Sequence, residues 1–327
     1  MKLTKAIVIF CSIFYLQIGR GHAANAATAH TVRGVVITTD GTVVPEFTIT
    51  VKHVSQKPEL LTRKRFKNGA FTVSGLRGDK YQLQIASPLY IPSRLEYDFK
   101  SDPRSTEYSI VILHTYRNEP RFTPGAAYTV SVKTLKEKIP DTAREAYMKG
   151  VELHRDGHLE EALMQYGKAL RTYPDYVSAL GDLGSIFILF NRPDSALTFL
   201  RRAHEIDDCN VVINMNIAIA LTEQADYANA MKLFKKVLST NPRLALAEYY
   251  VAKLEYLQKK YEEAEVYVRQ ALEDDPRLLE ASLLLIDISM QEKKYGQARD
   301  ALVQIRQAMA NKMISAFIDE QLSALGS

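Results

Sequence analysis

The chain has 327 residues, of which 46% are hydrophobic, enough for two ordinary hydrophobic cores. Its formal net charge of +4 is small, so nothing in the composition indicates a nucleic-acid partner. The charge is unevenly spread: 17 Lys/Arg against 10 Asp/Glu give +7 over residues 30–140, and 22 against 28 give −6 over residues 141–327. This division predicts two domains with opposite electrostatic fields.

The first 26 residues are typical of a secretory leader. Lys2 and Lys5 precede an apolar run from Ala6 to Ile18, and Ala24-Asn25-Ala26 follows it like a cleavage motif. The apolar run is too short to cross a bilayer comfortably. We therefore predict a signal peptide over residues 1–26 and a bacterial protein that is exported, periplasmic or secreted, without a membrane span after cleavage. The alternative is an uncleaved N-terminal anchor.

Removal of this leader would leave Cys209 as the sole cysteine, so the mature chain could not form an internal disulfide. We interpret Cys209 as a residue of a turn between helices. An intermolecular disulfide is the alternative.

Residues 30–116 show the period-two alternation of half-buried strands. The residues expected on the inner side of these strands are Phe47, Ile49, Val51, Phe71, Val73, Tyr81, Leu83, Ile85, Leu95, Tyr97, Phe99, Tyr108, Ile110 and Ile112. Asp40-Gly41 and Asn68-Gly69 suit tight hairpins, because both pairs tolerate positive φ. About seven short strands without a helical period predict an antiparallel β-sandwich of the prealbumin or immunoglobulin type.

The succession from Asn68 to Val73 (NGAFTV), followed by Gly75 to Tyr81 (GLRGDKY), resembles the carboxypeptidase regulatory-like domain. The resemblance covers roughly Thr31 to Thr115. It departs from the family at Pro88-Leu89-Tyr90, where a glycine is frequent. The resemblance implies a prealbumin-like sandwich that accompanies other domains and is not itself catalytic. Because similar sandwiches include carbohydrate-binding members, it also implies sugar binding as an alternative function.

Four basic residues crowd the strand that enters the Asn68-Gly69 turn: Arg63, Lys64, Arg65 and Lys67. Such a patch suits an anionic polysaccharide, lipid headgroups or the acidic second half of the chain. A charged edge strand that discourages aggregation between sheets is the alternative. Residues 117–141 then contain several prolines and are predicted to form a linker, in which Tyr128 to Val132 alternates and could add a strand.

Residues 142–327 contain an internal repeat with a period of 34 residues. A small residue recurs at Ala162, Ala196, Ala230, Ala264 and Ala298. Twelve residues before each of these lie Gly150, Gly184, Ala218, Ala252 and Ile286, and proline ends three of the repeats at Pro174, Pro242 and Pro276. Small residues at these places let two short helices pack closely, and a single pair cannot bury its own apolar face. The spacing predicts stacked helix pairs.

Five units in this register resemble tetratricopeptide repeats, although the tryptophan that is frequent in that family is absent. The predicted architecture is therefore a β-sandwich followed by an all-α solenoid of about five repeats. Met313 to Leu325 is expected to form a closing helix over the last apolar face.

In repeats of this kind the first helices line a concave groove, where the second, fifth, ninth and twelfth positions share a face. The candidate partner-binding residues read from the first helices are Arg144, Tyr147, His154, Met215, Asn216, Tyr249, Lys253 and Tyr256. Their mixture of aromatic, apolar and charged side chains suits a helix or an extended peptide. The alternative is that several of them simply pack between repeats.

The sequence offers little support for an enzyme. His158 and Glu161 match the His-x-x-Glu pattern of zinc carboxypeptidases, but one such match is expected by chance in a chain of this composition. No nucleophile elbow, phosphate-binding glycine loop or paired-cysteine motif is present. We therefore expect no cofactor, no metal and no catalysis. The prediction is an exported scaffold that binds a protein or peptide, and the alternative is a cell-envelope glycan-binding module led by the sandwich.

Overall fold

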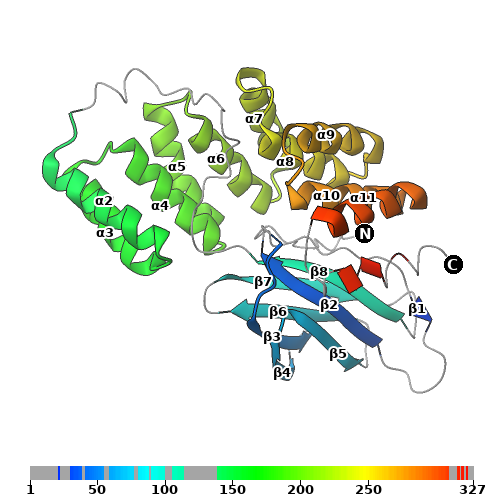
Figure 1. Cartoon of the computed structure of the whole chain (residues 1–327). Helices are drawn as coiled ribbons and strands as arrows, with labels where there is room; N and C mark the ends of the chain where they lie inside the picture. The colour runs from blue at the N-terminus through cyan, green and yellow to red at the C-terminus, as the bar shows by residue number, and fades with distance from the viewer. Residues whose placement is uncertain are drawn as a thin grey trace, which may run out of the picture. The chain divides into compact units, whose positions relative to one another are not determined.

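The computed structural model describes residues 21–22, 30–38, 41–54, 59–76, 80–87, 90–99, 105–113 and 138–308, with five further residues between 315 and 322 (Figure 1). Most of the predicted leader and linker, the candidate strand at Tyr128 to Val132 and most of the closing helix lie outside these residues. The two leader residues that are described form strand β1 (Gly21–His22), which pairs with β8.

The β part has two four-stranded sheets, as predicted. One has the order β1-β8-β2-β5 and the other the order β4-β3-β6-β7. The strands after β1 are β2 (His30–Thr38), β3 (Glu46–His53), β4 (Glu59–Lys67), β5 (Ala70–Leu76), β6 (Lys80–Ser87), β7 (Tyr90–Asp98) and β8 (Ser105–Leu113). One pairing departs from the antiparallel prediction, because β2 and β8 run parallel.

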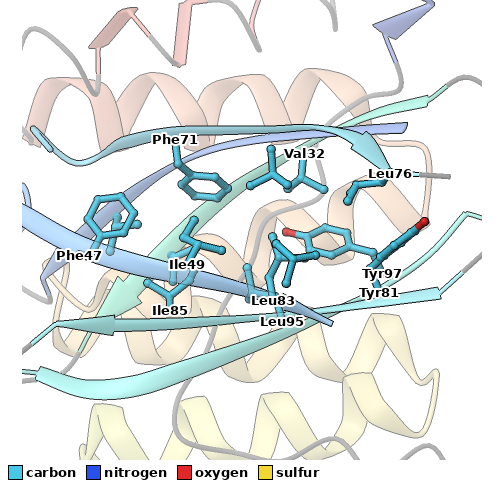
Figure 2. Close-up of a cluster of buried hydrophobic side chains, with 14 of the residues drawn as sticks. Val32, Phe47, Ile49, Phe71, Leu76, Tyr81, Leu83, Ile85, Leu95 and Tyr97 are labelled. Atoms are coloured by element: carbon cyan, nitrogen blue, oxygen red, sulfur yellow. The ribbon is translucent and has the colours of Figure 1, made fainter. Parts of the chain in front are cut away.

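Inward-facing side chains of both sheets form a single core (Figure 2). Every residue predicted to face inward on β3, β5, β6 and β7, and Phe99 beyond β7, is buried. On β8 the side chains of the predicted Tyr108 and Ile110 lie outside the described part of the structure, and the prediction is wrong for Ile112: Val111 and Leu113 join this core, whereas Ile112 does not. Ile112 is nonetheless buried, like Val35 and Ile37 on β2. Alternation cannot identify the inner face of a strand that is buried on both sides.

The Asn68-Gly69 turn has positive φ at both residues, 59° and 73°, as its composition predicted. The predicted hairpin is wrong, however, because β4 and β5 lie in different sheets. The turn carries the chain from one sheet to the other, and the backbone N–H of Val36 donates to the carbonyl of Gly69 at 2.7 Å. The other predicted turn is also tight: Gly41 has a φ of 79°, and the N–H of Thr38 donates to the carbonyl of Thr42.

Over residues 138–308 the structure describes ten helices in five pairs, which form a solenoid of the tetratricopeptide type. They are α2 (Asp141–Arg155), α3 (Leu159–Thr172), α4 (Val177–Leu189), α5 (Pro193–Ile206), α6 (Val211–Glu223), α7 (Tyr227–Thr240), α8 (Ala245–Leu257), α9 (Tyr261–Asp274), α10 (Leu279–Gln291) and α11 (Tyr295–Ala308). Small residues allow the close approach within a pair, as predicted. A Cβ at Gly150 would lie 2.6 Å from the ring of Tyr166, and a Cβ at Gly184 would lie 2.5 Å from Leu200.

Each pair turns at one left-handed residue, again with the period of 34. These residues are Gly157, Asn191, Ala225, Lys259 and Lys293. In the first pair the N–H of Gly157 donates to the carbonyl of His154, and the N–H of His158 donates to that of Leu153. These are the two bonds of a Schellman cap, which satisfies the last carbonyls of the first helix.

Candidate functional site: the first-helix face of the repeats

The predicted partner-binding residues lie on the first helices α2, α6 and α8, but most are less accessible than expected. Arg144 is exposed, and Tyr147, Asn216 and Tyr256 are half-buried. The other four, His154, Met215, Tyr249 and Lys253, are buried. The positions that share a helix face therefore divide into residues that a partner can touch and residues that support them.

Tyr147 and His154 belong to a polar network that joins the first two helix pairs. The Tyr147 hydroxyl on α2 donates to Oδ2 of Asp182 on α4 at 2.9 Å, and Tyr166 on α3 hydrogen-bonds to the same carboxylate. Nδ1 of His154 lies 3.3 Å from the Tyr166 hydroxyl oxygen. Since that hydroxyl has one proton and donates it to Asp182, the neutral His154 ring donates from Nδ1. Asp182 is the member that sequence reasoning missed.

Burial perturbs the titration of this network. It raises the pKa of Asp182 to about 6, although the hydrogen bonds from Tyr147 and Tyr166 oppose the rise. It lowers the pKa of His154 to about 4, because the protonated ring would lose its hydration. Burial and the neighbouring carboxylate raise the pKa of both tyrosines well above the ordinary value. His154 is therefore a neutral structural residue at physiological pH.

Tyr249 and Lys253, which were predicted to line the groove together, do come together on α8. The Lys253 ammonium lies 5.7 Å from the ring centroid of Tyr249 and 5.6 Å from that of Tyr250, within cation–π range. Two effects act on the carboxyl of Glu223 at the end of α6. The nearby charge of Lys253 lowers its pKa, but burial has the larger effect and raises the pKa to about 8. Together these groups form a compact aromatic and charged cluster between two consecutive helix pairs.

Buried carboxylates on the first helices are the second feature that sequence reasoning missed. Burial raises the pKa of Glu248 on α8 to about 7, and the charges of Asp274 and Glu273 add to the rise. Burial also raises the pKa of Asp287 on α10. Glu248 occupies the repeat position where tryptophan is frequent in the family. That unusual substitution was visible in the sequence and could have drawn attention to it.

The four basic residues of β4 are all exposed, but they do not form one patch. Lys64 lies opposite the buried Ile49 on β3, so it is on the inner side of the sheet. Arg63, Arg65 and Lys67 lie opposite Thr50, Thr48 and Glu46 on the outer side. Arg65 forms an ion pair with Glu46 at 2.6 Å.

The His-x-x-Glu match has no metal-site geometry around it. Nδ1 of His158 lies 3.4 Å from Oε1 of Glu161, and both side chains are exposed. Within the described part of the chain, no three His, Cys, Asp or Glu residues are placed to hold a metal ion. Over the same residues, none of the helices combines the length and the apolar character needed to cross a membrane. Cys209 is exposed at the turn before α6.

Comparisons with known proteins agree with the repeat register. A tetratricopeptide repeat model matches residues 147–208, and the model of the second ARM domain of tetratricopeptide repeat protein 21 matches residues 197–293. No curated protein matches the chain by sequence.

Several solved structures resemble the chain. PilW, a widely conserved type IV pilus biogenesis factor, matches with a TM-score of 0.51 and 20% identity over 57% of this chain and 87% of its own. A tetratricopeptide repeat protein from Parabacteroides merdae ATCC 43184 has a TM-score of 0.48 and 20% identity, over 57% of this chain and 75% of its own. MamA from Desulfovibrio magneticus RS-1 has a TM-score of 0.46 and 16% identity, over 52% and 95%. The helix pairs and the family models together identify the helical part of the chain as an array of tetratricopeptide repeats.

Proposed function

We propose that this chain is a non-catalytic, exported scaffold that binds a protein or peptide through the first-helix face of its repeats. One observation carries the proposal: the first helices α2, α6 and α8 carry a mixed set of aromatic, amide and charged side chains, in which Tyr147, Met215 and Tyr249 occupy equivalent places of the 34-residue repeat. Arg144, Asn216 and Tyr256 are the exposed or half-buried members of this set that lie outside the hydrogen-bonded network of Tyr147. The proposed export depends on the leader-like residues 1–26.

The chemistry of the face suggests the kind of partner. Burial raises the pKa of Glu223 to about 8 and that of Glu248 to about 7, so both carboxyls are partly protonated near neutral pH. A cation from a partner would favour their ionised forms and so gain binding energy. Apolar anchors of the partner would pack against rings such as that of Tyr256. An amphipathic helix or an extended peptide with basic residues meets both conditions.

The test is affinity capture from an envelope extract with the full chain as bait. The triple variant Arg144→Ala, Asn216→Ala, Tyr256→Ala removes the accessible face without emptying a buried site. A matched control, Met164→Ala, Arg171→Ala, Lys232→Ala, truncates three exposed residues of the second helices. We expect the first variant to lose at least about tenfold of the specifically captured partner and the control to behave like the wild type. Equal recovery by both variants would show that the partner binds elsewhere.

The identity of the β part is a separate proposal. We infer that residues 30–116 form a carboxypeptidase regulatory-like sandwich, and the support for this assignment is the sequence motif together with the turn and core places that its residues take in this chain. Asn68 and Gly69 adopt the left-handed turn, and Phe71, Val73 and Tyr81 are buried in the core. An experimental structure with a different strand order would contradict this assignment.

A further inference from the structure

The outer side of the sheet β4-β3-β6-β7 is strongly cationic. Among the described side chains, alternation and strand register place on it six basic residues and two acidic ones: Lys52, Arg63, Arg65, Lys67, Lys80 and Arg94 against Glu46 and Glu96. Glu46 is neutralised by Arg65 at 2.6 Å, and Glu96 accepts a hydrogen bond from Gln82 at 2.9 Å. Between the charges lie Thr48, Thr50 and Gln84, which are short or uncharged. The side is therefore a polar, cationic surface carried by four strands.

One corner of this surface is apolar. Leu60 and Leu61 on β4 are 57% and 46% exposed, and Val54, directly after β3, is 42% exposed. Leu60 lies opposite Lys52 in the strand register, and a bulge separates this pair from the pair of Val51 and Thr62. Three large aliphatic side chains thus project into solvent beside the basic residues.

A protective edge does not account for this combination. β4 is the last strand of its sheet, and basic side chains on an edge strand do discourage pairing with other chains. Exposed leucines on the same strand have the opposite effect, because they favour association. Their exposure therefore suggests a partner that buries them.

We propose that this corner and the cationic outer side bind an anionic phospholipid surface. A layer of lipid headgroups offers negative charge to all six basic residues at once, and Leu60, Leu61 and Val54 enter the apolar region below it. An anionic polysaccharide would satisfy the charges but gives no reason for the aliphatic corner. No aromatic ring lies among the described side chains of this outer side, so a platform for neutral sugars is absent there.

Vesicle cosedimentation with the full chain tests the proposal. The probes are phosphatidylcholine vesicles with and without about one-third phosphatidylglycerol. We expect binding to the anionic vesicles alone. Since each basic residue near such a surface contributes about fivefold in affinity, the variant Arg63→Gln, Arg65→Gln, Lys67→Gln should bind roughly a hundredfold more weakly. A control variant that loses the same charge on the helices should bind like the wild type; its substitutions are Arg171→Gln, Arg201→Gln and Lys232→Gln.

The leucines separate a lipid surface from other polyanions. The variant Leu60→Gln, Leu61→Gln should lose at least about tenfold in vesicle affinity. Its remaining binding should be purely electrostatic, so a salt concentration at which the wild type still binds should abolish it. Retention on immobilised polygalacturonate, measured in parallel, should be weaker than vesicle binding and insensitive to the leucines. Tighter retention on the polysaccharide would overturn the proposal. So would vesicle binding that is unchanged in the leucine variant, or lost equally in the helix control.

Discussion

Replacing Asp182 by asparagine isolates the energetic effect of the buried network. The amide oxygen of asparagine can still accept the hydrogen bonds of Tyr147 and Tyr166, but it has no charge to desolvate. The pKa of Asp182 is about 6 in the folded chain and 3.8 when unperturbed. The folded state therefore binds the proton more tightly, and this group lowers the free energy of unfolding as the pH rises through that interval. The change is about 3 kcal/mol for two pKa units.

His154 contributes in the opposite direction. Its pKa falls from 6.5 to about 4 on folding, so its contribution to stability is present above pH 6.5 and is lost as the pH falls towards 4. In the wild type the contributions of Asp182 and His154 to the free energy of unfolding change in opposite directions between about pH 4 and 6, and they nearly cancel. In Asp182→Asn only the contribution of His154 changes with pH. The variant should therefore gain stability relative to the wild type as the pH rises from 4 to 7, by up to about 3 kcal/mol.

Urea unfolding followed by circular dichroism at 222 nm, repeated across this pH range, measures the difference. Glu160→Gln, which removes one exposed carboxylate from α3, controls for the loss of charge. If the curves of free energy against pH for wild type and Asp182→Asn run parallel, the desolvation argument is wrong.

Two further predictions concern the repeat geometry. Gly184→Ala should destabilise the chain by roughly 1–3 kcal/mol, since the new Cβ would lie 2.5 Å from Leu200. The control Gly181→Ala should be tolerated, because its new Cβ has its nearest contact at 3.7 Å. Thermal unfolding monitored by circular dichroism tests this difference, and equal melting temperatures of the two variants would contradict it. Lys259→Gly should raise the free energy of unfolding by roughly 1 kcal/mol because it removes a side chain from a left-handed backbone, and Gly157→Ala, at the equivalent place in the first repeat, should lower it. Urea titrations that ranked these two variants in the reverse order would refute the cap assignment.

The repeats were predictable because their information is local. A period of 34 residues specifies which residues pair within each helix hairpin, and Gly150 and Gly184 are small for a reason that the structure makes explicit. The sandwich was predictable only in part. Alternation identified the inner residues of β3, β5, β6 and β7, but β2 and β8 have apolar residues on both sides. Which strands pair, and in which direction, depends on contacts between distant segments that no local pattern records.

The candidate binding face shows the same limit. Helical periodicity placed Tyr249 and Lys253 together, yet it could not show that both would be buried. Whether a residue on such a face is accessible depends on the neighbouring helix pairs. For the same reason no local pattern indicated that Asp182 would accept hydrogen bonds from two tyrosines of the preceding repeat.

The parallel pairing of β2 with β8 has a consequence for how the chain acquires its structure. Arg33 pairs with Tyr108, so the first long strand of the β part finds one of its two long neighbours, β8, only after nearly the whole β part has been synthesised, whereas its other neighbour, β5, comes earlier in the chain. Each helix hairpin, by contrast, needs only its own contiguous segment. Folding rates fall as contacts become more distant in sequence. We therefore expect the repeats to form quickly and the sandwich to close slowly, with the edge of β2 that will pair with β8 transiently open to chaperones or to aggregation.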